Sequence, residues 1–134
     1  MTTVEVIEQH IRAFNERQEA DEPWAEDAHM VAPGGAQPTG RAEVLGFLRV
    51  FQTAFPDGRL VVRTIFADGP NGAVEGVFEG THDGPLASPG GEVPPTGRTV
   101  SFRWAAVYEA DGGRLWSEHL FFDQADFLAQ LGLG

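Results

Sequence analysis

The residues best suited to acid–base chemistry lie in one stretch near the end of the chain, LWSEHLFFD at residues 115–123. It reads as a β-strand, and side chains alternate along a strand, so the odd-numbered residues are predicted to share one face. That face carries Leu115, Ser117, His119, Phe121 and Asp123. Burial moves the pKa of an imidazole and of a carboxyl toward neutrality. If this face lines a cavity, His119 and Asp123 could therefore transfer protons at pH 7.

Other kinds of chemistry are excluded by residues that the sequence lacks. Cys is absent, which removes thiolate nucleophiles, disulfides and Cys metal sites. All nine basic residues are Arg, so no Lys amine is present for Schiff-base chemistry. The four His residues show neither HxH nor HxxxH spacing, which argues against a metal site. The side chains left for catalysis are His, Asp, Glu, Tyr, Ser and Thr.

Length and charge narrow the class of protein. A chain of 134 residues with 42% apolar residues is expected to form one globular domain over residues 1–134. The net charge of −11 argues against DNA or RNA as a partner, because phosphate binding needs a basic patch. No run of about 18 apolar residues predicts a membrane span, and no signal-peptide pattern is evident. We therefore expect a cytoplasmic protein without a membrane partner.

The first half of the chain is predicted to be helical. Apolar residues recur at helical spacing over residues 3–17, with Thr2 or Thr3 as the N-cap, and His10 falls outside that stripe and is expected to face solvent. DEPWAEDA (21–28) suggests a short second helix, in which Trp24 packs inward. A third helix is predicted from a Thr39 cap to about Ala54.

The second half is predicted to form strands. Residues 59–67, 73–82, 98–109 and 114–123 are rich in strand formers and separated by turn signals. Residues 83–97 form a long loop, and a short helix closes the chain at Gly132. Helices followed by an antiparallel meander predict an α+β fold, in which a curved sheet wraps over the helices and encloses an apolar cone.

Several motifs together resemble the SnoaL-like polyketide cyclases of the nuclear transport factor 2-like and ketosteroid isomerase-like superfamily. They are FPDGR (55–59), GTHDG (80–84), VPPTGRTVSFR (93–103), the strand ending in Asp123, and QLG (130–132). The resemblance covers Val4 to Gly132. It implies a cone-shaped barrel, a homodimer or higher oligomer, and an apolar pocket without metal or organic cofactor.

The resemblance also implies site residues. Asp123 corresponds to the family's acid/base, and His82 to the histidine of its GTH motif. His119 stands where relatives often carry Trp, and His29 lies two positions before the place where they often carry His. The residues expected to bind substrate are His29, Phe47, Phe51, Phe102, Trp104, Phe121 and Trp24. From the sequence alone, Asp123 could equally be the N-cap of the closing helix.

Three functions remain open. The first is a cofactor-free cyclase that closes a ring of an aromatic or polycyclic carbonyl compound by intramolecular aldol condensation, with Asp123 as acid/base and His119 or His82 as its partner. The second is an epoxide-opening or hydroxylase-type relative on the same fold. The third is a non-catalytic, dimeric small-molecule-binding module, in which Asp123 is engaged in capping or in an ion pair with Arg103.

Overall fold

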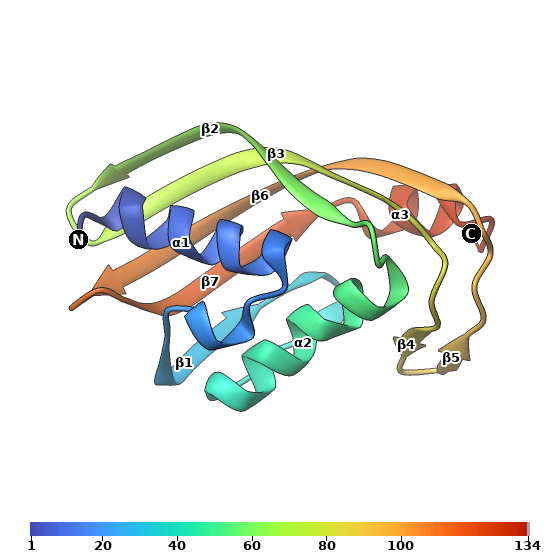
Figure 1. Ribbon diagram of the computed structural model, residues 1–134, viewed down its shortest axis with the longest axis horizontal. Helices are drawn as coiled ribbons and strands as arrows, with labels where there is room; N and C mark the ends of the chain where they lie inside the picture. The colour runs from blue at the N-terminus through green and yellow to red at the C-terminus, as the bar shows by residue number, and fades with distance from the viewer. Residues whose placement is uncertain (134) are drawn as a thin grey trace.

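The computed structural model of the protein, which describes residues 1–133, is built around one curved mixed sheet (Figure 1). The strands follow the spatial order β1-β7-β6-β3-β2. Their bounds are Trp24–Val31 for β1, Arg59–Asp68 for β2, Asn71–Thr81 for β3, Thr99–Asp111 for β6 and Arg114–Phe122 for β7. β1 pairs with β7 in parallel and the other neighbours are antiparallel. The α+β prediction is confirmed, and the sheet curves over the helices without closing into a barrel.

Helix α1 (Thr3–Glu16) begins as the sequence predicts. The Thr2 side chain accepts a hydrogen bond from Glu5 N, and the Glu5 carboxylate accepts one from Thr2 N, which completes a capping box. The helix ends at Arg17, whose backbone is left-handed at φ 55°. The Arg17 guanidinium donates to the carbonyls of Phe55 and Gly58, so it holds the turn that leads into β2.

The prediction of a second helix over residues 21–28 is wrong. Residues 24–31 form β1, preceded by the short 3-10 turn η1 (Glu19–Asp21). Proline and acidic residues suit the first turn of a helix, but here pairing along β7 decides the local structure.

The N-cap of helix α2 (Arg41–Ala54) is Gly40, one residue after the predicted cap at Thr39, and the helix ends where predicted. It follows the 3-10 turn η2 (Pro33–Gly35). Its buried residues Val44, Leu45 and Leu48 share one stripe. α1 and α2 both lie under the concave face of the sheet (Figure 1).

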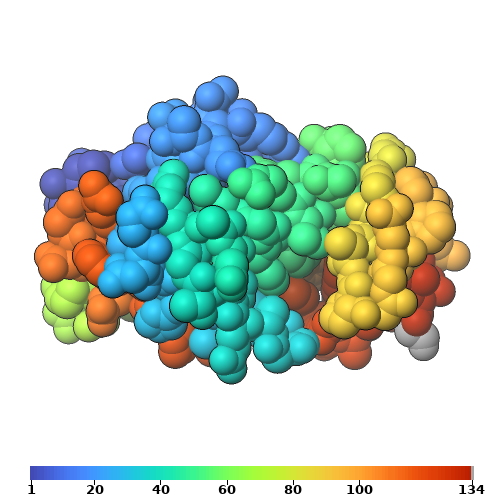
Figure 2. Space-filling model, turned by 90° about the horizontal axis from the view of Figure 1, so that it is seen from below, coloured from blue at the N-terminus to red at the C-terminus, as the bar shows by residue number. Residues whose placement is uncertain are grey.

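The predicted loop at residues 83–97 contains a small hairpin, β4 (Leu86–Ser88) with β5 (Gly91–Val93). It lies beside the C-terminal part of α2, as the space-filling view from below shows (Figure 2). Helix α3 (Gln124–Gln130) closes the described chain. Within residues 1–133 no helix has the length and apolar character needed to cross a membrane.

Candidate active site

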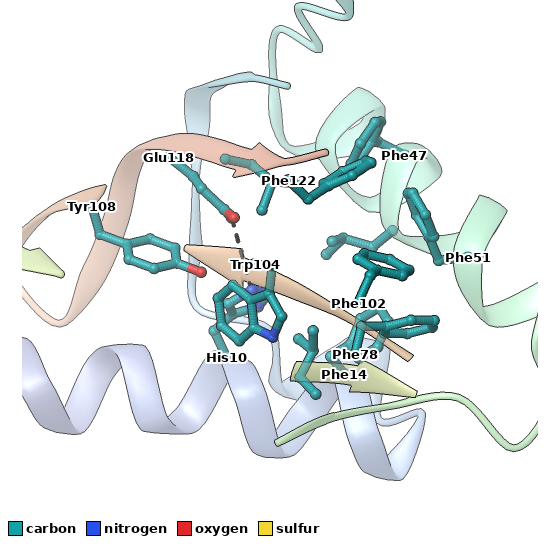
Figure 3. Close-up of a pocket in the computed structure, with 13 residues that line it drawn as sticks. His10, Phe14, Phe47, Phe51, Phe78, Phe102, Trp104, Tyr108, Glu118 and Phe122 are labelled. Atoms are coloured by element: carbon teal, nitrogen blue, oxygen red, sulfur yellow. Dashed lines mark ion pairs between the residues drawn. The ribbon is translucent and has the colours of Figure 1, made fainter. Parts of the chain in front are cut away.

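A hollow of about 50 Å³ lies between the concave face of the sheet and the two long helices (Figure 3). Its outer end is walled by aromatic rings, and its inner end carries the polar side chains of His10, Tyr108 and Glu118. The complete lining is His10, Phe14, Phe47, Leu48, Phe51, Leu60, Phe78, Phe102, Trp104, Tyr108, Glu118, Leu120 and Phe122.

The wall of the hollow follows from strand alternation. Even-numbered residues of β6 point inward, and three of them, Trp104, Ala106 and Tyr108, are paired with even-numbered residues of β7. Trp104 lies opposite Phe122, and Tyr108 lies opposite Glu118. Because directly opposed residues share a face in an antiparallel pair, both members of each pair line the hollow.

The face that β7 turns inward differs from the prediction. Leu115 pairs with Ala110 whereas Ser117 pairs with Glu109, so Trp116 is an extra residue and forms a β-bulge. The extra residue exchanges the two faces of the strand beyond it. Glu118 therefore points into the hollow, and His119 and Phe121 lie exposed on the outer face of the sheet.

The inner end of the hollow is a buried cluster of ionisable groups. His10 on α1 lies between two carboxylates. Its Nδ1 is 2.6 Å from Glu22 Oε1, and its Nε2 is 3.8 Å from Glu118 Oε1. Trp24 Nε1 donates to the same oxygen of Glu22 at 3.1 Å. Tyr108 adds its hydroxyl from β6 (Figure 3). The cluster therefore draws on α1, the start of β1, β6 and β7.

Burial shapes the acidity of this cluster. It raises the pKa of Glu118 from 4.5 to about 7, although the neighbouring His10 charge acts in the opposite direction. Burial also opposes charging of His10, but the Glu22 and Glu118 carboxylates outweigh it, so the pKa of His10 is raised. Burial, and then the charge of Glu118, raise the pKa of Tyr108 well above its ordinary value. A carboxyl with a pKa near 7 is poised to accept and return a proton at neutral pH.

Three buried polar atoms around the hollow have no hydrogen-bond partner within residues 1–133: Trp104 Nε1, the Tyr108 hydroxyl and Glu118 Oε1. Buried polar groups are nearly always paired, because an unpaired one costs about 1–3 kcal/mol. Unpaired groups lining a hollow are therefore available to a ligand. They offer an N–H donor, a hydroxyl and an acid.

Four of the predicted substrate-binding residues line the hollow: Phe47, Phe51, Phe102 and Trp104. Trp24 is buried behind His10, with ring centroids 5.2 Å apart, and is not among the lining residues. His29 is exposed on β1, on the outer side of the sheet with His119 and Phe121.

Asp123 is exposed at the end of β7 and does not line the hollow. Its carboxylate accepts a hydrogen bond from Asp126 N at 3.0 Å, which makes it the N-cap of α3. The capping interpretation is confirmed, and a catalytic role for Asp123 stays a prediction.

His82 is fully buried, away from the hollow. Its Nδ1 accepts from Thr96 N at 3.1 Å, while its backbone bonds to Arg98 and Gly97. These contacts fasten the two ends of the 83–97 segment together. The GTH and PPTGR motifs thus meet in space, and a catalytic role for His82 stays a prediction.

Neither His10 nor Glu118 is among the site residues predicted from the sequence. The prediction that His10 faces solvent is wrong, since it is 1% exposed. The spacing of His10 could have predicted its burial. His10 follows Ile7 by three residues and precedes Phe14 by four, which puts all three on one helical face. Glu118 carried no such signal, because its face depends on the bulge at Trp116.

Throughout the described part of the chain, no group of three or more His, Asp or Glu side chains is arranged to hold a metal ion.

A curved sheet over two long helices, with a cavity beneath it, defines a class of small α+β proteins. The sequence profile of the SnoaL-like polyketide cyclase family matches residues 4–131. The chain therefore belongs to the SnoaL-like polyketide cyclase family. No curated protein matches it.

Solved structures with the same fold include three that match almost the whole chain. A candidate SnoaL-like polyketide cyclase from Jannaschia sp. CCS1 is 18% identical, with a TM-score of 0.86 over 98% of this chain and 92% of that one. IdmH, a candidate polyketide cyclase from Streptomyces antibioticus, is 29% identical, with a TM-score of 0.82 over 98% and 99%. A Catenulispora acidiphila DSM 44928 protein with a ketosteroid isomerase-like fold is 20% identical, with a TM-score of 0.80 over 99% and 96%.

Proposed function

We propose that this protein is a cofactor-free cyclase that closes a ring of an aromatic or polycyclic carbonyl compound by an intramolecular aldol reaction, with Glu118 as the acid/base. The observation that carries the proposal is the Glu118 carboxyl, which is buried at the end of an apolar hollow and has a pKa of about 7. The family supports a cyclase-type reaction on a small molecule.

The reaction needs one proton acceptor and one oxygen-binding site. The Glu118 carboxylate removes a proton from a carbon beside a carbonyl, and the electron pair moves onto oxygen to give an enolate. The Tyr108 hydroxyl and the Trp104 N–H are the donors available to that oxygen. The enolate carbon then attacks a second carbonyl of the same molecule, and a carbon–carbon bond forms. The new alkoxide takes the proton back from Glu118, so all atoms are retained.

The aromatic rings of the hollow supply the remaining catalysis by holding the reacting carbons together. The hollow of about 50 Å³ is far smaller than a ligand site of roughly 300–1,000 Å³. A substrate must therefore displace rings at the outer end. Phe47, Phe51 and Phe122 are half-buried there, so they can move at less cost than the fully buried core.

A second candidate is hydration or epoxide opening, favoured by the carboxylate of Glu22 beside His10. Such a reaction uses a second acid near the base that activates water, and a hollow of 50 Å³ suits a few water molecules. In this reaction Glu118 takes a proton from water, the hydroxide oxygen attacks an epoxide carbon as the C–O bond of the ring breaks, and the released alkoxide takes the proton back from Glu118.

The proposal includes a dimer. The outer face of the sheet carries large apolar side chains that are exposed, namely Phe66 at 62%, Phe121 at 58% and Val107 at 49%. Phe66 and Val107 both lie opposite Ala73, so they belong to one patch, and a contiguous apolar patch marks an interaction site. A second copy packed on this face would bury it and leave the hollow, on the other side of the sheet, free for substrate.

Proton abstraction can be measured without the natural substrate. The probe is 2-tetralone in D₂O, a bicyclic ketone whose α-hydrogens are replaced by deuterium when a base removes them, followed by NMR. The wild-type protein is expected to accelerate the exchange above buffer, and Glu118→Gln to lower that acceleration by at least about 10²-fold. Asp123→Asn is the matched amide variant at the other candidate acid and is expected to stay within a few-fold of wild type.

Two outcomes would contradict Glu118 as the base. Glu118→Gln could exchange 2-tetralone as fast as wild type while it is correctly folded by circular dichroism. Alternatively, Asp123→Asn could lose the activity that Glu118→Gln keeps, which would return the role to Asp123. Absence of exchange by the wild-type protein would favour the non-catalytic binding module.

A further inference from the structure

The buried cluster contains one carboxylate that the proposed aldol reaction does not use. Glu22 lies between η1 and β1 and is 5% exposed. On the inner side, Glu22 Oε1 contacts both His10 Nδ1 and Trp24 Nε1. Its outer side borders a separate surface hollow, lined also by Gln9, Ala20, Asp21, Pro23, Trp24, Glu26, Arg41, Gly113 and Arg114. Glu22 therefore stands between His10 and the surface.

His10 turns one ring nitrogen to each of two acids. Glu22 Oε1 accepts from Trp24 Nε1, as an ionised carboxylate does, so the short contact at 2.6 Å places a proton on His10 Nδ1. In the neutral ring, Nε2 then carries a lone pair, and that atom faces Glu118 Oε1 at 3.8 Å. A histidine held only for packing needs one hydrogen bond, whereas this one is placed to receive a proton at Nε2 and release one from Nδ1.

A proton taken up by Glu118 has no polar exit through the mouth of the hollow. Glu118 is 3% exposed, and the path outward passes the rings of Phe102, Phe51 and Phe47. A substrate seated on those rings would exclude water from that path as well. The aldol reaction returns its proton to the product, but Glu118 acts as the base only when it is ionised, and with a pKa of about 7 part of the Glu118 carboxyls carry a proton at neutral pH. Loss of that proton to solvent with a substrate in place needs another route.

We propose that His10 and Glu22 form a proton relay that connects Glu118 with the surface hollow beside Arg41 and Arg114. The relay rests on the proposed function, because it serves Glu118 as the base. The proton on the Glu118 carboxyl passes to His10 Nε2, the proton on Nδ1 passes to Glu22 Oε1, and Glu22 releases it to surface water. One proton leaves: Glu118 ends ionised and ready to act as the base, Glu22 is ionised as before, and His10 stays neutral with its proton moved from Nδ1 to Nε2. A second transfer needs that proton to return to Nδ1. The 3.8 Å between His10 and Glu118 is closed by a small rotation of the Glu118 side chain or by one bridging water.

The charged and titratable neighbours of His10 suit this transfer. Glu118 faces it from β7, Tyr108 from β6 with ring centroids 5.9 Å apart, and Glu22 from the segment before β1. Arg41 on α2 donates to the backbone carbonyls of Glu22 and Trp24, which fixes the outer end of the relay. Against the effect of burial, the Glu22 and Glu118 carboxylates raise the pKa of His10, so both favour a proton on the His10 ring.

The test measures how fast the His10 Nδ1 proton exchanges with water, by saturation transfer on protein with ¹⁵N-labelled His. A purely structural hydrogen bond protects its proton, so weakening it in Glu22→Gln would speed the exchange. A relay predicts the opposite, because the amide cannot carry the proton outward. We expect Glu22→Gln to slow the exchange by at least about tenfold. Glu118→Gln makes the same change at the inner end and is expected to stay within about threefold of wild type.

A second measurement uses the wild-type protein alone and decides the question if Glu22→Gln does not fold. Because the outer end of the relay opens on the surface, the exchange rate should rise with the concentration of inorganic phosphate, a buffer base. Three outcomes would overturn the relay. The His10 Nδ1 proton could exchange as fast in Glu22→Gln as in wild type, or faster; both variants could slow the exchange equally; or the wild-type rate could be independent of the phosphate concentration. Failure of Glu118 as the base appears separately, in the exchange of 2-tetralone.

Discussion

His10 on α1 and Glu118 on β7 face each other across the inner end of the hollow, with 3.8 Å between His10 Nε2 and Glu118 Oε1. Both side chains are almost wholly buried. The pair binds protons more tightly in the folded protein than in the unfolded chain, since both pKa values are raised. Proton binding is therefore coupled to folding.

The first prediction is that stability falls as the pH rises from 5 to 8. Glu118 has a folded pKa of about 7 against 4.5 in the unfolded chain, so its stabilising contribution is full below 4.5 and is lost as the pH rises through 7. His10 acts in the same direction, because its raised pKa gives a contribution that is full below 6.5 and is lost above the folded pKa. The loss from Glu118 is on the order of 3 kcal/mol.

Urea denaturation across this pH range measures the effect. Glu118→Gln removes the ionisation and should flatten the pH dependence of the free energy of unfolding. The variant should therefore become more stable relative to wild type as the pH rises. Glu8→Gln, the same change at an exposed position of α1, should leave the slope as it is. Parallel pH profiles for wild type and Glu118→Gln would contradict the burial of a titrating acid.

Most of the fold could be predicted from local signals. The Thr2 cap, the apolar stripe of α1 and the end of α2 at Ala54 are all encoded within a few residues. The four long strands follow from their turns, as at Gly112 and Gly113, where both residues have positive φ. Such features do not depend on distant parts of the chain, and so the sequence alone predicts them.

The site could be predicted only in part, because its geometry is non-local. Phe47, Phe51, Phe102 and Trp104 are large apolar residues on the inward faces of regular elements, and they line the hollow as predicted. The bulge at Trp116 arises from pairing with β6 and β1, and no residue type in the sequence predicts it. One inserted residue is enough to exchange the two faces of a strand.

The second prediction concerns the outer end of the hollow. The ring of Phe51 packs against those of Phe47, Phe78 and Phe122, with centroids 5.5–6.2 Å apart. Phe51→Ala should enlarge the hollow and destabilise the protein by about 2–3 kcal/mol, since the ring is only half-buried. The larger hollow should bind 2-naphthol more tightly than wild type does, measured by fluorescence titration. Phe66→Ala, on the outer face of β2, is the control, and equal naphthol affinity in all three proteins would show that Phe51 does not limit entry.

The third prediction tests why the GTHDG motif needs its last glycine. Gly84 N donates to Ala54 O at 3.1 Å, which docks the start of the 83–97 segment on the end of α2. A Cβ at Gly84 would lie 2.0 Å from Thr53 O, closer than any real contact allows. Gly84→Ala should therefore lower the free energy of unfolding by more than about 2 kcal/mol. Gly90→Ala in the same segment meets nothing within 4 Å and should change it by less than about 0.5 kcal/mol. Similar urea midpoints for the two variants would contradict the docking.

The fourth prediction concerns the outer face of the sheet. Phe121 lies opposite Ala105 in the pairing of β7 with β6, and Val107 lies opposite His119 on the same face. A charge placed in an apolar interface must be desolvated, which costs several kcal/mol when it has no partner. If a second copy covers this face, Phe121→Glu should shift the protein from dimer to monomer in light scattering coupled to size-exclusion chromatography. Arg12→Gln makes the same change of one negative unit on the exposed side of α1 and should leave the mass unchanged. A wild-type protein that is monomeric even in a concentrated stock, or a Phe121→Glu variant that remains dimeric, would rule out this face as the interface.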